Sequence, residues 1–477
     1  MIAIDKYDTS VPFVNTTNVS HLFKRKELVT MDMTPLKIGG DAVKRSNYWD
    51  EDTAHLPVSP PTGDRITGVL SADVLIVGAG FSGLSCAIHL LAEDPKAKVI
   101  IVERDHAGRG SSSRSAGMVE PGLLGITWTL EGAVESETDA RWGFNAARRR
   151  LASLLGQLDE RGIAAELIKC DNVISAQTSI SSQVAQDLGK RMSDFGLETK
   201  WIDAADANTR FGTTGHGALV YEGHSVHPSL LAHSLREKAL SMGAQLYEGD
   251  TVVELAEVTG KVVGKTKAGG AVMAGGCLIA CGAWAGELGI KSRTAPEIVH
   301  TWMCATEKLP AEILAQAGSE QMALVAELSD SKNTSYRRVH NGRILYGNYD
   351  EPGHHVDAQV DEKMLKSLHD AAVKSMPYLK DVKIDFVWGG PILGMAHDLP
   401  FIEVYPNLPN TALVAPNGST GVPWALLSGG MVGGIVRDDA TGDAEGERLR
   451  NLLNETRMPW MTAGGMIGRA IWRSLEL

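Results

Sequence analysis

The clearest pattern of apolar and polar positions in the chain begins at Asp73. An apolar run at 74–77 predicts a buried strand, and apolar residues then recur at helical spacing from Leu84 to Leu91. A second apolar run at 99–102 predicts another strand. Glycines separate the first strand from the helix, so the segment has the order strand, turn, helix, strand.

The later part of the chain alternates between predicted helices and strands. Residues 228–240 have helical periodicity, 245–255 have the character of a strand, and 277–280 form a buried apolar strand. Residues 332–349 and 382–388 are predicted to be antiparallel strands. Parallel α/β segments thus flank mixed β segments, which favours an α/β (α+β) fold with interleaved domains.

The first 68 residues show no sustained periodicity. They contain polar stretches and the pair Pro60-Pro61, which interrupts regular structure. We therefore expect residues 1–68 to form an extension that wraps the body of the protein or is partly disordered. We place no function there.

The composition narrows the class of protein. The 477 residues suit two domains, and the 43% apolar and 22% charged residues are typical of a globular protein. A net charge of −12 disfavours a nucleic-acid partner. Five cysteines, with no metal-ligand motif, fit a reducing compartment. No apolar run reaches the roughly 18 to 20 residues that span a bilayer and no signal peptide pattern is present, so we expect a soluble, cytoplasmic protein.

A glycine-rich turn lies between the first strand and the helix. Gly78, Gly80 and Gly83 have the spacing G-x-G-x-x-G, which permits a tight turn, close approach of a pyrophosphate and close helix packing. The helix directs its free N–H groups and positive dipole end toward such a pyrophosphate. Glu103 lies twenty residues after Gly83, where a carboxylate accepts hydrogen bonds from ribose hydroxyls. The pattern predicts a site for NAD or FAD, and a glycine turn without a ligand is the alternative.

A second segment of small residues distinguishes between these two cofactors. It runs from Gly110 to Met118 and begins seven positions after Glu103. Its backbone and hydroxyl groups are suited to line a further stretch of phosphate and ring, and Arg114 adds one positive charge. We therefore predict FAD, while a flexible surface loop is the alternative interpretation.

A second helix start is predicted late in the chain. Residues 417–421 are small and polar, and Pro423 falls in the first turn of an apolar run that continues to Val436. A helix dipole at such a place stabilises negative charge on a reduced flavin. A tight turn before a core helix is the alternative.

The order of these motifs resembles the FAD-dependent D-amino-acid oxidase and glycine oxidase family, especially the branch similar to gamma-glutamylputrescine oxidoreductase. In that branch a segment of the form G-A-S-G-R-N-G-G follows the acidic residue, and Gly110, Ser112, Arg114 and Gly117 match it. The resemblance covers roughly residues 47–440 and includes these further segments: Asn47-Tyr48-Trp49, His227-Pro228, Ala280-Cys281-Gly282-Ala283-Trp284, Tyr336-Arg337-Arg338, Gly342-Arg343-Ile344-Leu345-Tyr346-Gly347, Trp388-Gly389-Gly390 and Asp398-Leu399-Pro400.

The resemblance implies a Rossmann-like FAD-binding domain interleaved with a mainly antiparallel substrate domain. The expected ranges are 1–68 for the extension, 69–131, 215–297 and 385–440 for the FAD-binding domain, 132–214 and 298–384 for the substrate domain, and 441–477 for a helical tail. It also implies that the late helix points at the pyrimidine side of the flavin ring.

Noncovalent FAD is expected from the same resemblance. Some relatives attach the flavin through a histidine where this chain has Arg114, and others use a late cysteine, whereas no cysteine follows Cys304 here. The residues expected to contact FAD are Gly78, Gly80, Phe81, Ser82, Gly83, Glu103, Arg104, Gly110, Ser111, Ser112, Arg114, Ser115, Ala116, Gly117, Met118, Val253, Gly282, Trp284, Asn417, Gly418, Ser419, Thr420 and Gly421.

The substrate is expected to lie against the β segments and flavin-facing loops. Arg337 is suited to bind a carboxylate through two parallel hydrogen bonds, although alternation on a strand predicts that Arg337 or Arg338 faces solvent. The tryptophans are equally well explained by core packing, and His397 by an ordinary hydrogen bond. The candidate substrate residues are Trp302, Arg337, Trp388, His397 and Trp424.

These observations predict an FAD-dependent oxidoreductase that oxidises a C–N bond of an amine or amino acid by hydride transfer, giving an imine that hydrolyses. The electron acceptor is oxygen or another molecule. A 2-hydroxy-acid or polyol dehydrogenase on the same fold is one alternative. A noncatalytic flavoprotein subunit of a complex is another. A nicotinamide-dependent dehydrogenase is disfavoured by the second small-residue segment.

Overall fold

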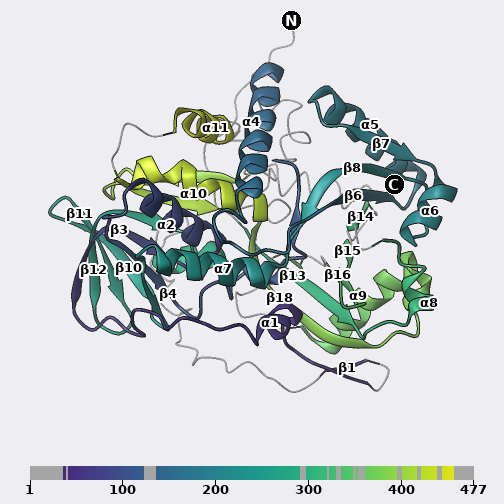
Figure 1. Cartoon of the computed structure of the whole chain (residues 1–477), viewed down its shortest axis with the longest axis horizontal. Helices are drawn as coiled ribbons and strands as arrows, with labels where there is room; N and C mark the ends of the chain where they lie inside the picture. The colour runs from purple at the N-terminus through teal and green to yellow at the C-terminus, as the bar shows by residue number, and fades with distance from the viewer. Residues whose placement is uncertain are drawn as a thin grey trace, which may run out of the picture. The chain divides into compact units, whose positions relative to one another are not determined.

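The segment from Val69 to Glu103 forms the strand, turn, helix and strand that its pattern predicts. β3 (Val69–Val77) runs parallel to β4 (Val99–Glu103), with Val74 paired to Val99, and α2 (Phe81–Glu93) connects them (Figure 1). The apolar residues at 74–77 of β3 and 99–102 of β4 are buried on both faces, as expected for a parallel sheet covered on both sides.

The structure is a computed structural model. It describes residues 36–38, 41–122, 136–289, 297–319, 322–328, 335–347, 351–352, 360–394, 400–415, 421–437 and 443–455. All of these residues belong to one compact unit that spans Thr34–Leu477.

An eight-stranded sheet is built around this first unit. Its main order is β10-β11-β12-β3-β4-β9, and β20 pairs with both β12 and β19. β3, β4, β9, β12 and β20 form the parallel part, and β10, β11 and β19 add antiparallel strands. The further bounds are β9 (Gln245–Glu248), β10 (Val252–Val258), β11 (Lys261–Thr266), β12 (Ala271–Ile279), β19 (Phe401–Val404) and β20 (Thr411–Ala415).

The single strand predicted at 245–255 is two strands in the structure. Gly249 has a φ of +80°, which turns the chain between β9 and β10. Asp250 follows it, and its carboxylate accepts a hydrogen bond from the amide of Ile66 at 3.0 Å. The turn therefore also attaches the end of the predicted extension to this sheet.

A ten-stranded, mainly antiparallel sheet forms the second layer. Its main order is β17-β13-β16-β15-β14-β6-β8-β5, with β18 paired to β13 and β7 to β8, and only β14 and β6 run parallel. The bounds are β5 (Met118–Val119), β6 (Ile168–Ala176), β7 (Thr199–Ile202), β8 (Ala218–Ser225), β13 (Glu297–Thr306), β14 (Met322–Leu328), β15 (Ser335–Arg338), β16 (Ile344–Gly347), β17 (Glu351–Pro352) and β18 (Ile384–Gly394).

Sheet membership differs from the expected domain ranges at three strands. β5, β8 and β18 fall in ranges expected for the FAD-binding domain, yet all three pair within the ten-stranded sheet. The reason is that a strand can pair with a strand that is distant in sequence, so sequence ranges alone do not determine which sheet a strand joins. We keep two interleaved domains as a proposal, with these three strands assigned to the second.

Helices cover the sheets and carry most of the connections. The elements near the eight-stranded sheet are α4 (Glu137–Gly156), α7 (Pro228–Ser241), α10 (Gly421–Arg437) and α11 (Ala444–Glu455), and the turn η3 (Gly282–Leu288) follows β12. The remaining helices and turns are α5 (Ser179–Asp194), α6 (Ala204–Phe211), α8 (Ala311–Leu314), α9 (Glu362–Ser375), η2 (Ser112–Arg114) and η4 (Pro377–Leu379). No helix among these described ranges is long and apolar enough to cross a membrane.

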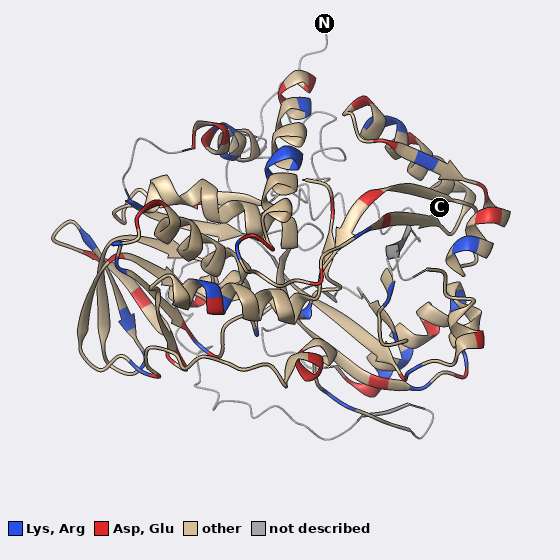
Figure 2. Ribbon diagram, viewed as in Figure 1, with Lys and Arg blue, Asp and Glu red and all other residues tan. Residues whose placement is uncertain are grey.

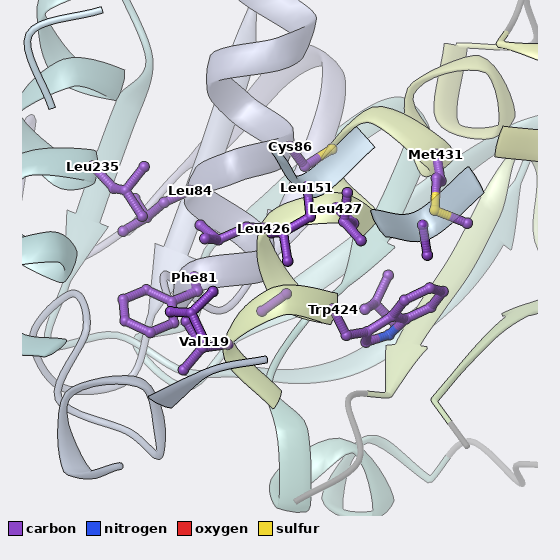
Figure 3. Packing of buried hydrophobic residues seen from close by; sticks show 14 of the residues in the cluster. Phe81, Leu84, Cys86, Val119, Leu151, Leu235, Trp424, Leu426, Leu427 and Met431 are labelled. Atoms are coloured by element: carbon purple, nitrogen blue, oxygen red, sulfur yellow. The ribbon is translucent and has the colours of Figure 1, made fainter. Parts of the chain in front are cut away.

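The largest apolar core lies where α2, α4, α7 and α10 meet (Figure 3). α10 packs closely on α2, because Gly429 has no side chain and a Cβ there would lie 2.5 Å from Ser85 Oγ. The hydroxyl of Ser85 donates to the carbonyl of Leu426 at 2.8 Å, which fixes the register of the two helices. Figure 2 shows α10 almost without charged residues, whereas α4 carries several. A helix of that composition is stable only when buried.

The two faces of the ten-stranded sheet are covered by different elements. Met303 and Trp388 are paired across β13 and β18 and pack with Tyr48 and Trp49, so we call this side the α1 face. Trp302 and its neighbours pack with residues of α9 on the opposite side, the α9 face. Successive residues of a strand alternate between these two faces.

The expected extension runs between the two sheets. Lys44 forms a bridge to Phe386 at the edge of β18, and α1 (Tyr48–Thr53) follows, packed on the α1 face below β13 and β18 (Figure 1). The amide of Thr62 then donates to the carbonyl of Leu246 in β9 at 2.7 Å. The short pair β1 (Leu36–Ile38) and β2 (Asp41–Val43) precedes these contacts. From residue 41 to 68 the extension therefore wraps the body of the protein.

Candidate functional site: a dinucleotide cradle beside the α1 face

The glycine turn between β3 and α2 is shaped by close backbone contacts. Gly78 has a φ of +103°, and a Cβ there would lie 2.7 Å from the carbonyl oxygen of Ala280. A Cβ on Gly83 would overlap the carbonyl oxygen of Gly78. Gly80 is the N-cap of α2 and supplies no side chain to the first-turn N–H groups. Apart from the amide of Phe81, which donates to Ser112, the turn leaves the helix N-terminus without a side-chain cap, which fits the pyrophosphate of FAD.

Glu103 ends β4 beside this turn. Its carboxylate accepts hydrogen bonds from the amides of Ala79 at 2.8 Å and Asp105 at 2.9 Å. Burial raises the pKa of Glu103, while the two amides act in the opposite direction. The carboxylate is therefore held in one orientation with oxygen lone pairs remaining for further donors, which fits the ribose hydroxyls of a dinucleotide.

The small-residue segment from Gly110 to Met118 lies directly against the helix start. The amide of Phe81 donates to the hydroxyl of Ser112 at 3.0 Å. Arg114 and Trp388 form a reciprocal pair of bonds, since Arg114 Nη1 donates to the carbonyl of Gly389 at 2.6 Å and Trp388 Nε1 donates to the carbonyl of Arg114 at 3.0 Å. The structure thus places this segment between the eight-stranded sheet and the α1 face of the other.

Four further residues expected at the cofactor lie near the ends of β4, β10 and β12. The guanidinium of Arg104 stacks 4.3 Å from the ring of Trp284 in η3. Val253 falls at a bulge of β10, where the register shifts between its two neighbours, so its backbone groups are outside the regular ladder. Gly282 has a φ of +57° and no described atom within 4 Å of its Cβ position. The Cβ position of Gly282 therefore faces open space.

The late helix begins as predicted, but most of its expected cofactor residues lie outside the described ranges. Asn417, Gly418, Ser419 and Thr420 are not described, and neither is His397. Gly421 is the first residue of α10, and no described atom lies within 4 Å of its Cβ position. Since the close contact at Gly429 fixes α10 against α2, the N-termini of the two helices keep a fixed position relative to each other.

The candidate tryptophans do not come together. Trp388 lies on the α1 face, whereas Trp302 lies on the α9 face with its ring over Gly389. Trp424 is fully buried in the apolar core of the helices (Figure 3). One pocket walled by all three is therefore excluded, because the sheet separates Trp302 from Trp388.

Arg337 lies on the α1 face, since it pairs with Leu345 of the same cluster. Its Nη1 donates to the carbonyls of Ala116 at 2.9 Å and Val226 at 2.7 Å, so it contacts the small-residue segment directly. The side chain is 7% exposed, and burial lowers the pKa of Arg337 to about 10. No carboxylate among the described residues pairs with it, and a buried guanidinium without a counter-ion is suited to bind an anion.

The expectation that Arg337 or Arg338 faces solvent holds only in part, because Arg337 is buried and Arg338 is partly exposed. Arg338 points to the other side of β15, as alternation predicts, but its Nη1 donates to the carbonyls of Leu314 and Gly318 at 3.3 Å and 2.9 Å. The turn after α8 covers that side of the strand. Alternation determines which face a side chain takes, whereas only the tertiary structure determines whether that face is covered.

The cysteines play no part in the site geometry. None of the five is in a disulfide, and Cys86, Cys170, Cys277 and Cys304 are buried. Burial raises the pKa of Cys281 to about 12, which disfavours the reactive thiolate. The expectation that Cys277 and Cys281 serve packing agrees with their places in the core around β12.

Sequence reasoning did not single out Glu120 or Thr301. Glu120 follows β5 directly, is 9% exposed, and accepts one hydrogen bond from the hydroxyl of Tyr221 at 3.5 Å. The hydroxyl of Thr301 is buried without a partner among the described residues, and Thr301 pairs with Gly390, whose Cβ position lies 3.5 Å from the Arg114 side chain. Neither residue belongs to a motif, so only their surroundings reveal them.

Burial raises the pKa of Glu120 to about 8. Between the unfolded value of 4.5 and that of the folded protein, only the folded chain keeps the proton. The stability from this group is therefore complete below about pH 4.5 and is lost as the pH rises to about 8. As the pH rises from 5 to 8.5, we expect the free energy of unfolding of Glu120→Gln to increase by roughly 2–5 kcal/mol relative to that of wild type.

Urea unfolding of both proteins at these two pH values measures this difference. Glu160→Gln, at an exposed position, is the matched control and should show no such change. An equal stability difference between Glu120→Gln and wild type at both pH values would contradict the prediction.

The fold and the cradle define a protein with a dinucleotide-binding sheet and a second, mainly antiparallel sheet. The family model described as FAD dependent oxidoreductase (DAO) matches residues 73–434, so the chain belongs to this family. It is an FAD-dependent oxidoreductase, and its cofactor is FAD. The resemblance noted in the sequence is confirmed.

Curated proteins and solved structures are similar over most of the chain. The probable oxidoreductase OrdL of Haemophilus influenzae is 26% identical over 89% of this chain and 93% of its own length. Gamma-glutamylputrescine oxidoreductase of Escherichia coli is 24% identical over 79% of this chain and 86% of its own length. The crystal structure of glycine oxidase from Geobacillus kaustophilus has a TM-score of 0.65 and 22% identity, and covers 78% of this chain and 97% of that one. The last comparison supports the fold.

Proposed function

We propose that the chain oxidises the C–N bond of an amino acid or a related amine that carries a carboxylate. Bound FAD supplies the hydride acceptor. The substrate carbon loses a hydride, its neutral nitrogen loses a proton, and the resulting imine takes up water to give a carbonyl compound and an amine or ammonia. The reaction therefore balances with one reduced flavin for each substrate oxidised.

Arg337 is the observation that carries this proposal. It is a buried cation on the α1 face that contacts the segment expected at the flavin, and the described carboxylates make no ion pair with it, since Glu166 acts on it only at longer range. An anionic substrate would supply that charge through hydrogen bonds from the remaining guanidinium N–H groups. The bound carboxylate would then hold the reacting carbon at a fixed position relative to the cofactor. This orientation would be the main contribution of the site to the rate of reaction.

Two other residues of the α1 face are proposed to complete the pocket. Trp388 would form part of its wall beside Arg114, and Thr301 would offer a hydroxyl to the substrate or to the flavin. Trp302 and Trp424 are left out of the proposed site, because one lies on the other face and one in the helix core.

Anaerobic mixing of the purified yellow protein with paired compounds tests the proposal. The two members of each pair differ in one group, for example glycine with methylamine, which lacks the carboxylate, and alanine with lactate, which has a hydroxyl in place of the amine. Loss of flavin absorbance with the amino acids alone is the expected result. Bleaching by hydroxy acids alone would select a hydroxy-acid dehydrogenase, and no bleaching by any small molecule would select a noncatalytic flavoprotein.

Replacing Arg337 by lysine tests its role in binding the carboxylate. Lysine keeps the charge but lacks the planar fork that holds two oxygen atoms. We expect kcat/KM for the best carboxylate substrate to fall roughly 10- to 100-fold, mainly through KM. Steady-state kinetics and the FAD content of the variant measure this. An unchanged KM with full FAD content would count against Arg337 as the carboxylate ligand.

The attachment of FAD and the electron acceptor are also proposals. We propose noncovalent FAD, which acid precipitation tests, since the colour should remain in the supernatant. Oxygen uptake during turnover, compared with reduction of an artificial dye, distinguishes an oxidase from a dehydrogenase.

A further inference from the structure

Four consecutive carbonyl groups of the small-residue segment accept hydrogen bonds from side chains that are distant in sequence. Asn47 Nδ2 donates to Ser113 at 3.0 Å and Trp49 Nε1 to Ser115 at 3.0 Å. As described above, Trp388 donates to the carbonyl of Arg114, and Arg337 donates to the carbonyl of Ala116. Each donor is at least nine-tenths buried. Two of the four donors come from α1 and its cap, which precede the residues that the family model matches.

These bonds set the direction of the peptide N–H groups. In a trans peptide the carbonyl of one residue and the N–H of the next point in opposite directions within one plane. Holding the carbonyl of Ser115 against Trp49 therefore turns the amide of Ala116 away from α1. That amide has no acceptor among the described residues. Of the four amides that follow the held carbonyls, those of Arg114 and Gly117 donate within the loop, so the loop presents the amides of Ser115 and Ala116 on its other side.

α1 is itself fixed on two sides, so it can act as a rigid support. The hydroxyl of Ser229 donates to Asp50 at 2.6 Å, and His227 contacts Asp52 at 3.2 Å, both at the N-terminus of α7. On the other side, Asn341 Nδ2 donates to the hydroxyl of Tyr48 at 2.6 Å. The helix thus bridges the start of α7 and the ten-stranded sheet.

We infer that Asn47 and Trp49 are positioning residues of the FAD site, which hold the peptide groups of the segment Gly110–Met118 in the orientation that binds the cofactor. This inference rests on the proposed contact between that segment and FAD. It assigns a role in the cofactor site to a stretch of chain that precedes the residues matched by the family model, and it is independent of the substrate.

Two substitutions remove the donors and keep side chains of similar shape. Asn47→Asp retains an oxygen that caps α1 by accepting from the amide of Trp49, but it removes the N–H that bonds Ser113. Trp49→Phe retains an aromatic ring and removes the N–H that bonds Ser115. Trp142→Phe is the matched control, because Trp142 lies on α4 under Arg448.

The measurement is the Kd for FAD, obtained by titrating each apoprotein with FAD and following the quenching of flavin fluorescence. We expect the Kd to rise roughly tenfold in Asn47→Asp and in Trp49→Phe and to stay unchanged in Trp142→Phe. The visible circular dichroism of the bound flavin should change in the same two variants.

Thermal unfolding of the apoproteins separates positioning from simple structural support. A lower unfolding temperature with an unchanged Kd would overturn the inference, and so would an equal rise in Kd for the control. Ser112→Ala, which removes the acceptor of the Phe81 amide, tests the underlying contact. If Ser112→Ala weakens FAD binding and the two α1 variants do not, the segment binds FAD but α1 does not position it. If none of the three changes the Kd, the proposed contact fails as well.

Discussion

A Gly83→Ala variant is expected to be purified without bound FAD. The new Cβ would overlap the carbonyl oxygen of Gly78 and approach Ile76 to 3.1 Å, so α2 has to move away from β3. That movement displaces the helix N-terminus that is suited to hold the pyrophosphate, and it opens the tight turn at Gly78. Because the clash is with backbone atoms, no change of side-chain rotamer relieves it. The effect on FAD should be larger than that of any single contact residue.

The ratio of flavin absorbance to protein absorbance in the purified variant measures this loss. Gly156→Ala is the matched control, because its Cβ meets no atom within 4 Å at the end of α4, and it should keep a full complement of FAD. Circular dichroism shows whether each variant is folded. A folded Gly83→Ala protein that binds FAD with wild-type affinity would disprove the proposed role of the turn.

Replacing Arg236 by methionine is expected to cost about 3–5 kcal/mol of folding stability. Arg236 in α7 is 4% exposed and bonds both oxygens of Glu248, at 3.2 Å and 2.9 Å. Glu248 ends β9, and its carboxylate also accepts from the amide of Ala107 at 2.7 Å. The substitution leaves a buried carboxylate without its cation, beside the loop that follows Glu103.

Chemical unfolding of Arg236→Met, Glu248→Met and the double variant measures the coupling between the two residues. The double variant should be more stable than Arg236→Met, because it no longer buries an unpaired charge. Lys265→Met breaks a pair between exposed residues and should cost less than about 1 kcal/mol. A loss of similar size for Arg236→Met and Lys265→Met would contradict this account.

Much of the dinucleotide unit was predictable because its signals are local. The spacing of Gly78, Gly80 and Gly83, and the place of Glu103 at the end of the next strand, depend on one turn and two neighbouring strands. The strand at 245–255 was not predicted correctly, because a single positive φ at Gly249 ends it. Short apolar patterns do not show where a turn interrupts them.

The substrate side was harder to predict, because its residues come from strands that pair over long distances. Trp302 and Trp388 are similar in sequence context, yet their register places them on opposite faces of one sheet. Glu120 belongs to no motif, and its raised pKa follows from burial beside Tyr221. The extension that precedes residue 69 carries no periodic pattern, yet Asn47 and Trp49 contact the segment Gly110–Met118.

The sequence by itself determined the family, the cofactor and the turn that is suited to hold the pyrophosphate, because those features depend on residue types at fixed short spacings. The tertiary structure alone decided that Arg337 is buried without a described counter-ion, that Trp302 lies away from the proposed site, and that α1 supports the segment from Gly110 to Met118. These outcomes depend on strand register and on contacts between distant segments, and such contacts are established only when the whole chain packs.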